Sequence, residues 1–393
     1  MRRAALYAIV PVLLSGWPVF RFLGYAGLVA YWVFGSGVVL MGVTVLRARP
    51  PESWLSPRRA HVAVGVVLVL YAAVFLVIYP IADSGRVGGG SDRDDALTQA
   101  ASRWLRGESP YAEPTYLGRP ISPLPGGLIL SMPWVALFGN AAYQNLFWLL
   151  ILYFVLIRLS RSVPMAACLF VLVTALSPAV QHELMTGGDL LANSLAVTTV
   201  AVLVGLGGGW LRGMRLVGLA ALSGLVLAWR ANFLLLLPIL VSRIARRTGH
   251  REAAAFAGIA LGAAAAAVVP VWFWDPEHFT PLRTYYEIGY LDSRVPHFGW
   301  AAVGAMAALS VGLALKGAPA RWLRHGALVQ GIPILAGSLL VSFVCPWCAF
   351  SFLQFGLMPL FLWVGDLVLN VHPPGLTDLA GRASAGPRVG SVL

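Results

Sequence analysis

Long apolar runs recur along the whole chain and constrain its fold more than any other feature. Hydrophobic residues make up 59% of the 393 residues and charged residues only 11%, whereas a soluble globular domain carries about 25% charged residues. Runs of spanning or near-spanning length lie at 4–20, 23–46, 61–80, 143–158, 164–179, 190–207, 216–229, 232–242, 254–274, 298–315, 326–344 and 348–365. Because about 20 apolar residues cross a bilayer as a helix, the sequence predicts an all-α polytopic membrane protein of about twelve transmembrane helices.

Basic residues are distributed unevenly over the segments between these runs. With the runs threaded alternately and the N-terminus inside, the inner segments carry nineteen basic and four acidic residues, and the outer segments nine and twelve. Basic loops face the cytoplasm, so both termini are predicted to be cytoplasmic and the segments 81–125, 182–189 and 275–297 extracytoplasmic. The basic clusters lack the interleaved aromatic residues of a nucleic-acid groove, so we expect no nucleic-acid partner.

Two apolar segments need separate interpretation. The run 126–138 is short and broken by prolines, and counting it as a span would place the later basic clusters outside, so an interfacial helix is predicted there. The run 4–20 follows a basic start, as in a signal peptide. It lacks a clear cleavage site and leads into a second apolar run, so we predict a retained first helix.

The longest polar interruption, 91–125, begins with Asp92, Arg93, Asp94 and Asp95. Apolar residues then recur at helical spacing up to Arg106, which predicts an amphipathic helix. Ser91 is the expected N-cap and Gly107 the expected C-terminal stop. At 100° per residue Asp94 lies near the edge of the apolar face, whereas Asp92 and Asp95 point away. Carboxylates are favoured at a helix N-terminus, which accounts for one or two of these acids but not for all three.

These motifs resemble those of a known family. Arg93-Asp94-Asp95, the turn Gly107-Glu108-Ser109-Pro110-Tyr111 and the step Pro120-Ile121-Ser122-Pro123-Leu124-Pro125 are similar to the first outer loop of GT-C-fold, polyprenyl-phosphate-sugar-dependent glycosyltransferases. The chain looks most like the bacterial enzymes that use polyprenyl-phosphate mannose, over roughly 61–365, with an Arg-x-Asn-Phe step at Arg230–Phe233. It departs from them in an Asp as second acid, in a missing aromatic residue after the acids, and in the added segment 1–60.

The resemblance implies an organisation and a reaction. It implies that 61–370 form a GT-C-like catalytic domain with its active site on the outer face of a bacterial plasma membrane. The hydropathy pattern itself predicts an N-terminal transmembrane hairpin at 1–60 and a disordered cytoplasmic tail at 371–393. The enzyme moves a sugar, mannose as the first candidate, from a polyprenyl-phosphate carrier to a glycolipid or glycan acceptor, with inversion. A carboxylate acts as general base on the acceptor hydroxyl. By position it is Asp94, with Asp92 and then Asp95 as substitutes.

Further polar residues are candidates for the donor and acceptor. Arg230 lies between two short apolar runs, where it either binds the donor phosphate or caps a helix end. His297 before a helix either binds that phosphate or is structural. The loop 182–189 either orients sugar hydroxyls or ends one helix and caps the next, with Gly187 and Gly188 as the turn. The expected substrate-binding residues are Arg93, Tyr111, His182, Glu183, Asp189, Asn193 and Asn232.

Other motifs point to no cofactor. The chain has no zinc-ligand spacing, P-loop or dinucleotide fingerprint, so we expect no resident metal and no required cofactor, although a divalent cation can assist. Cys345 and Cys348 have redox spacing but lie in an apolar run, which favours packing cysteines or a lumenal disulfide. Tyr285, Tyr286 and Tyr290 fit an aromatic belt better than a sugar platform. The sequence carries no indication of oligomeric state.

Two other functions fit the same sequence. A transporter or lipid flippase also needs short helices and buried charges, but no convincing repeat of two halves is present and the acids cluster in an outer loop rather than at the midplane. A catalytically degenerate GT-C relative would keep the fold and lose the chemistry. An Asp94→Asn variant separates the enzyme from the degenerate relative, because only the enzyme loses turnover.

Overall fold

The computed structural model describes residues 9–84, 91–207, 212–281, 296–316, 321–344 and 351–371, and within these residues regular structure is entirely helical. The all-α prediction is therefore confirmed for the described chain. The α-helices are α2 (Trp17–Ala48), α3 (Pro57–Asp83), α4 (Arg93–Leu105), α5 (Pro125–Phe138), α6 (Gln144–Ser160), α7 (Val163–Leu176), α8 (Pro178–Met185), α9 (Asp189–Leu206), α10 (Gly213–Leu227), α11 (Leu237–Arg247), α12 (His250–Trp274), α14 (Phe298–Lys316), α15 (Trp322–Val344) and α16 (Leu357–Val371). Short 3₁₀ turns are η1 (Pro51–Ser53), η2 (Ala141–Tyr143), η4 (Ala231–Leu236) and η7 (Ser351–Gly356).

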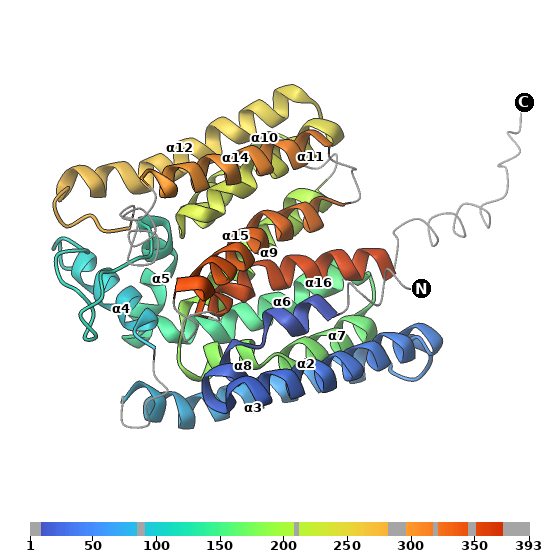
Figure 1. Cartoon of the computed structure of the whole chain (residues 1–393). Coiled ribbons are helices and arrows are strands. Elements are labelled where there is room, and N and C mark those ends of the chain that lie inside the picture. Colours follow the sequence, from blue (N-terminus) through green and yellow to red (C-terminus); the bar gives the residue numbers. More distant parts are fainter. Residues whose placement is uncertain are drawn as a thin grey trace, which may run out of the picture.

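The long helices lie side by side in a bundle, and α4 and α5 cover one of its ends (Figure 1). Six described helices are long and apolar enough to span a membrane, or seven if α7 and α8, bent by 75°, form one broken span. A membrane-embedded helical protein is thus supported, while the count of twelve spans stays a prediction. Several predicted spans are shorter than a bilayer crossing, among them α10 and the described apolar part of α14.

Burial divides the bundle into a protein core and an apolar outer surface. Nearly every residue of α9 is buried, and α6, α10 and α16 pack against it. By contrast α2 and α3 are apolar and largely exposed. A contiguous apolar surface of this size is unstable in water and stable in lipid, so these helices face the bilayer.

The N-terminal segment folds back on itself at Gly24. This glycine has φ +66° and interrupts the helical geometry of α2. A Cβ at Gly16 would lie 2.5 Å from Leu28, and one at Gly35 would lie 2.9 Å from Val12. Residues before Gly24 therefore pack antiparallel against those after it, and we call residues 9–48 the N-terminal hairpin.

The start of α5 joins the segment 91–125 to a break after α10. The backbone N–H of Leu124 donates to the carbonyl of Trp229 (2.9 Å), and that of Gly126 donates to the carbonyl of Ala228 (3.1 Å). Only a glycine fits at Gly126, because a Cβ there would lie 2.3 Å from the Leu225 carbonyl oxygen. The predicted helix break around Trp229 is confirmed, since α10 ends at Leu227 and η4 begins at Ala231.

The character of α5 differs from the prediction of an amphipathic interfacial helix. Its only hydroxyl side chain, Ser131, is fully buried, and the helix packs against α4, α10 and α12. An apolar helix without a polar face is stable when protein surrounds much of it, which is the situation of α5.

The two ends of the bundle differ in charge. Asp189 begins α9, and Asp83, Asp94, Asp95 and Glu183 lie near it; we call this the acidic end. About 24 Å along the same helix, by a rise of 1.5 Å per residue, the Gly205 carbonyl accepts hydrogen bonds from Arg243 at the other end. We call that the arginine end; it includes Arg246, which donates to the carbonyls of Ala314 and Leu315, and the pair Arg324–Asp366.

Candidate functional site

The helix α4 presents its first acids in different directions. The helix begins at Arg93 with Asp92 as N-cap, one residue later than the predicted cap Ser91, whose hydroxyl accepts a weak hydrogen bond from the Arg93 N–H (3.4 Å). The predicted stop is confirmed, because α4 ends at Leu105 and Gly107 has φ +76°. Asp94, predicted near the edge of the apolar face, has no exposed surface, while Asp92 and Asp95, predicted to point away from that face, are partly exposed.

Asp94 is held by neutral groups. The hydroxyl of Tyr79, on α3, donates to Asp94 Oδ2 over 2.5 Å, and the Asn140 side-chain amide donates to the same hydroxyl over 2.6 Å. The other carboxyl oxygen, Oδ1, is buried without a hydrogen-bond partner among the described residues. Gly187 closes this side, since a Cβ there would lie 2.4 Å from the Tyr79 ring and 2.9 Å from Asp94 Oδ2.

Asp83 and Asp95 complete a three-carboxyl group with Asp94. One oxygen from each lies within 4.8 Å of those of the other two. Burial raises the pKa of Asp94 from 3.8 to about 8, with a further contribution from Asp95, although the Tyr79 hydrogen bond opposes the rise. Burial, assisted by Asp83 and Asp92, raises the pKa of Asp95 to about 6. The group therefore holds protons near neutral pH unless a cation takes their place.

These three carboxyls could ligate a hard divalent cation, since oxygen ligands suit magnesium and calcium. They are the one such group found within the described residues. The sequence analysis did not identify this three-carboxyl group, because Asp83 belongs to α3 and only the fold brings it to the acids of α4. The expectation of no resident metal stays a prediction.

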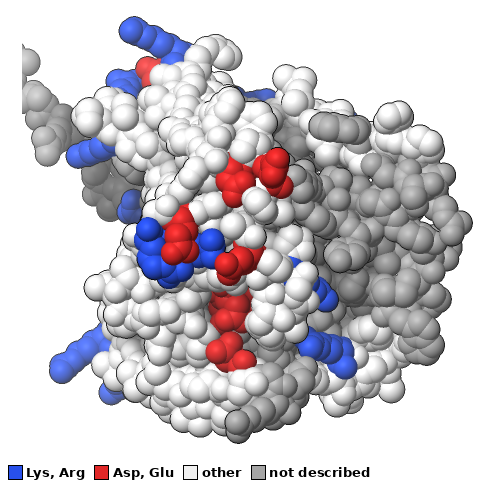
Figure 2. Space-filling model, turned by 90° about the vertical axis from the view of Figure 1, so that its left-hand side faces the viewer, with Lys and Arg blue, Asp and Glu red and all other residues white. Residues whose placement is uncertain are grey.

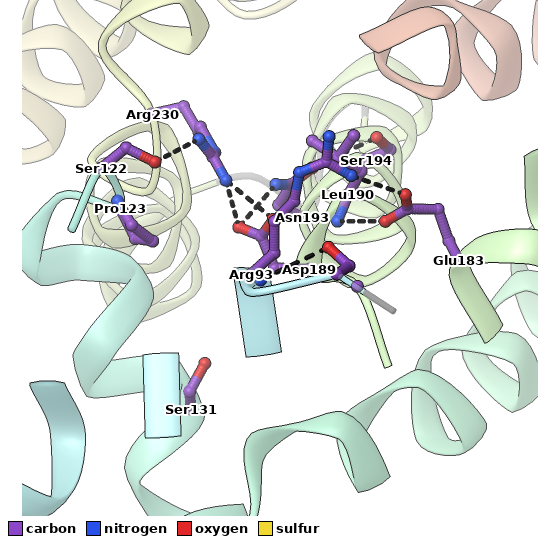
Figure 3. Close-up of polar contacts among 12 residues, drawn as sticks. Arg93, Ser122, Pro123, Ser131, Glu183, Asp189, Leu190, Asn193, Ser194 and Arg230 are labelled. Atoms are coloured by element: carbon purple, nitrogen blue, oxygen red, sulfur yellow. Dashed lines mark hydrogen bonds and ion pairs between the residues drawn. The ribbon is translucent and has the colours of Figure 1, made fainter. Parts of the chain in front are cut away.

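Two arginine–carboxylate pairs lie beside the first turn of α9 (Figure 3). Arg93 donates to Glu183 Oε1 over 2.8 Å, and Glu183 Oε2 accepts the backbone N–H of Leu190 over 3.1 Å. Arg93 also donates to Gln354 and lies over the ring of Phe355 at 5.8 Å. Glu183 thus joins α4 to the exposed N–H groups at the start of α9, where a negative charge is favoured.

The second pair is Asp189 with Arg230. One guanidinium nitrogen of Arg230 lies 2.7 Å and 2.6 Å from the two Asp189 oxygens, and another donates to Ser122 over 3.0 Å. Asp189 also accepts from Asn193 over 3.3 Å. Arg230 therefore links the break after α10 to α9 and to the segment 91–125. The predicted site residues Arg230, Asp189 and Asn193 lie together.

His182 lies in α8 on the side of the N-terminal hairpin. Its ring packs edge-on against Trp17, with centroids 5.2 Å apart, and is 9% exposed. Neither ring nitrogen has a hydrogen-bond partner among the described residues, and Nδ1 lies 3.9 Å from Glu183 Oε1. The predicted turn after α8 is confirmed at Gly187, which has φ +73°.

Three further predicted site residues are Tyr111, Asn232 and His297. Tyr111 is buried and donates to the Pro123 carbonyl over 2.8 Å, which closes the outer loop. Asn232 donates to the Gln330 side chain over 2.6 Å and accepts from it through its own carbonyl over 3.0 Å. His297 is exposed, has φ +65° and precedes α14.

Sequence reasoning missed Tyr79 and Asn140, the neutral partners of Asp94. Tyr79 and Asp83 are four residues apart at the outer end of one apolar run, a spacing that puts both on one face of α3. This spacing could have identified Tyr79 and Asp83 as a pair of polar residues on one helix face, whereas nothing in the sequence marks Asn140. The predictions for Cys345, Cys348, the tyrosines at 285, 286 and 290, and the tail from 372 onward concern residues outside those described.

Viewed from the acidic end, acidic side chains form a strip down the centre of the surface, partly set between uncharged ridges (Figure 2). The acids are thus gathered over the end of the bundle that α4 covers (Figures 1 and 2). No family model, curated protein or solved structure matches the chain.

Proposed function

We propose that the chain is an inverting glycosyltransferase. It moves a sugar, mannose as the first candidate, from a polyprenyl-phosphate carrier to a hydroxyl of a lipid or glycan acceptor at the outer face of the membrane. The observation that carries the proposal is Asp94: a fully buried carboxyl at the polar end of an apolar bundle, with no described arginine or lysine paired to it. Buried, uncompensated carboxyls cluster at functional sites, because folding alone gains nothing from them.

The chemistry follows from this environment. Asp94, once ionised, takes the proton of the acceptor hydroxyl as the oxygen attacks the anomeric carbon. The bond from that carbon to the carrier phosphate oxygen breaks on the opposite face, so configuration inverts and the lipid phosphate leaves as an anion. Because its pKa lies near 8, the carboxylate is a stronger base than an exposed Asp. The acceptor reaches Asp94 after the side chains that cover it move aside.

The leaving phosphate needs cationic partners rather than a strong acid. Arg93 and Arg230 both lie at the start of α9, held by Glu183 and Asp189, with side chains 18% and 12% exposed. Their charges are fixed before a substrate binds, so little reorganisation is needed. This arrangement supports Arg230 as the predicted partner of the donor phosphate and adds Arg93 to it. The displacement requires no resident cofactor.

The test is glycosyl transfer by purified protein from radiolabelled polyprenyl-phosphate mannose to a membrane-lipid extract. Asp94→Asn should lower turnover by about 10²- to 10⁴-fold, the usual contribution of a general base. Glu108→Gln is the matched control, because Glu108 is an exposed carboxylate of the same outer loop that pairs with Arg106 instead. It should transfer at the wild-type rate.

Three outcomes would change the proposal. Full activity in Asp94→Asn would move the base to Asp92 or Asp95. Loss of activity in Glu108→Gln as well would mean that the loop is sensitive to any charge change. No transfer by wild type from mannose, glucose or arabinose donors would favour a transporter or a degenerate relative.

A further inference from the structure

A narrow apolar crevice lies between the N-terminal hairpin, α7 and α16. Its cavity volume is about 70 Å³, and its lining includes Val12, Val39, Val43, Leu172, Leu360 and Val368. Such a space is too apolar to hold ordered water and too narrow for a bulky ligand. It suits a single hydrocarbon chain.

The crevice follows the helix axes. Along α7 its lining extends from Leu169 to Ser177, which corresponds to about 12 Å at 1.5 Å per residue. Ser15 and Ser177, whose hydroxyls are 2.9 Å apart, form its polar end, and Tyr31 donates there to the Leu176 carbonyl. The rest of the lining is apolar.

Beyond the Ser15–Ser177 end of the crevice lie the cationic side chain of Arg21, on the segment after Ser15, and the ring of His182, on the segment after Ser177. Trp17 lies two residues beyond Ser15, and its ring contacts His182 of α8, the helix that begins directly after Ser177. The guanidinium of Arg21 lies 5.3 Å from the Trp17 ring. The ring of His182 is nine-tenths buried, and neither of its nitrogens has a hydrogen-bond partner among the described residues, although Nδ1 lies 3.9 Å from Glu183 Oε1.

We propose that this crevice binds the prenyl chain of a polyprenyl phosphate, with the phosphate held by His182, Arg21 and Arg93. The inference rests on the proposed function. It assigns the polyprenyl carrier a contact surface in the N-terminal hairpin, in addition to the phosphate contacts proposed above. Within a bilayer every lipid tail is apolar, so the crevice by itself does not distinguish a prenyl chain from an acyl chain. Selection therefore depends on the anionic headgroup, and Arg93 places that headgroup one residue from Asp94.

The test is binding of tritiated undecaprenyl phosphate to the purified full-length protein in nanodiscs of neutral lipid. Val39→Trp fills the crevice and should weaken binding at least about tenfold, as an overpacked cavity excludes its ligand. Val38→Trp is the matched control, because Val38 is the neighbouring residue, exposed on the outside of the same helix. It should bind within about twofold of wild type.

The headgroup is tested with His182→Phe, which keeps a ring against Trp17 and removes both nitrogens. This variant should lose about tenfold in affinity for undecaprenyl phosphate, the value of one charge-assisted hydrogen bond, and nothing for undecaprenol. Inorganic phosphate at millimolar concentration should not compete. Thermal unfolding of each variant checks that it folds.

Wild-type affinity in Val39→Trp, or equal loss in Val38→Trp, would overturn the proposal. So would displacement of the tritiated probe by undecaprenol or phosphatidylglycerol as readily as by undecaprenyl phosphate. The binding assay needs no turnover and is repeated with Asp94→Asn. If wild type binds undecaprenyl phosphate headgroup-selectively but transfers no sugar, the proposed enzymatic function is refuted and the crevice proposal stands. If wild type transfers sugar and Val39→Trp binds the lipid as well as wild type does, only the crevice proposal is refuted.

Discussion

At the arginine end Asp366 accepts hydrogen bonds from Arg324 (2.9 Å) and from Asn370 (2.9 Å), whereas at the acidic end Asp94 accepts one from the phenol of Tyr79. Both carboxyls are almost fully buried, and each keeps one oxygen without a described hydrogen-bond partner. The unpaired oxygen therefore does not distinguish them. The difference is that Asp366 has a cation and Asp94 has a neutral group and two more carboxyls.

This difference distinguishes a buried carboxyl that stabilises the fold through an ion pair from one that is available to react or to bind a ligand. An ion pair such as Arg324–Asp366 is complete in the folded chain and needs nothing more. An uncompensated carboxyl either keeps its proton or takes a positive or proton-bearing partner from outside. The predictions below test this contrast, beginning with the largest effect.

The first prediction concerns the pH dependence of transfer by wild type. The pKa of Asp94 lies near 8, above its ordinary value, so the carboxylate that we propose as the base forms only as the pH rises toward 8. We expect kcat/KM to rise about tenfold per pH unit, or about 10³-fold between pH 5 and 8, and then to level off. Glu108→Gln should follow the same profile, and a flat profile over this range would contradict the assignment.

The second prediction breaks the pair at the arginine end. Arg324→Met leaves Asp366 buried without its cation and should lower the free energy of unfolding by ~3–5 kcal/mol. Adding Asp366→Leu should recover most of that loss, because the uncompensated charge is then gone. Unfolding in detergent micelles measures the free energy of unfolding of both variants. Equal stability of the single and double variants would show that the uncompensated charge of Asp366 costs nothing and that the loss comes from packing alone.

The third prediction compares neutral replacements at the two ends. Between pH 4 and 8 folded Asp94 holds a proton that the unfolded chain has released, so wild-type stability falls as the pH rises through this window. Asp94→Asn does not titrate and should be more stable at pH 8 by ~2 kcal/mol, below a ceiling of ~5 kcal/mol set by 1.4 kcal/mol per pKa unit. The gain should vanish toward pH 4.

Asp366→Asn is the counterpart of that experiment and should destabilise at pH 8, because it leaves Arg324 without its carboxylate. Melting temperatures of both variants at pH 5 and pH 8 give the comparison. The same sign of change in both would remove the distinction between the two ends.

The fourth prediction has the smallest effect. The hydrogen bond from Tyr79 holds the pKa of Asp94 below the value that burial alone would give. Tyr79→Phe should therefore move the midpoint of the pH–rate profile upward by about one unit, the worth of one hydrogen bond. Tyr71→Phe, on the same helix but bonded to Gln181, should leave the midpoint where it is.

Local patterns predicted part of this arrangement. The amphipathic spacing placed a helix after Asp92 with Asp94 near the edge of its apolar face, and Gly107 and Gly187 mark turns because both have left-handed backbone geometry. The interrupted apolar run near Trp229 marks a real helix break. In each case the information lies within about one helical turn of the residue concerned.

The partners of the charged residues could not be predicted in this way. Arg93 meets Glu183 from 90 residues away, and Arg230 meets Asp189 from 41 residues away. Such pairs depend on how the helices pack rather than on spacing in the sequence. The four-residue spacing of Tyr79 and Asp83 puts both on one face of α3, but their contacts with Asp94, and the contact of Asn140, depend on how α3, α4 and η2 pack.

The backbone hydrogen bonds from Leu124 and Gly126 to Trp229 and Ala228 have a consequence for biosynthesis. The acceptor carbonyls lie about a hundred residues downstream, so a ribosome adding 5–20 residues per second reaches them roughly 5–20 s later. Until then the start of α5 has no partner, and the Ser122 contact of Arg230 is equally absent. The acidic end of a nascent chain therefore completes its contacts late, well after the segment that carries its acids has been synthesised.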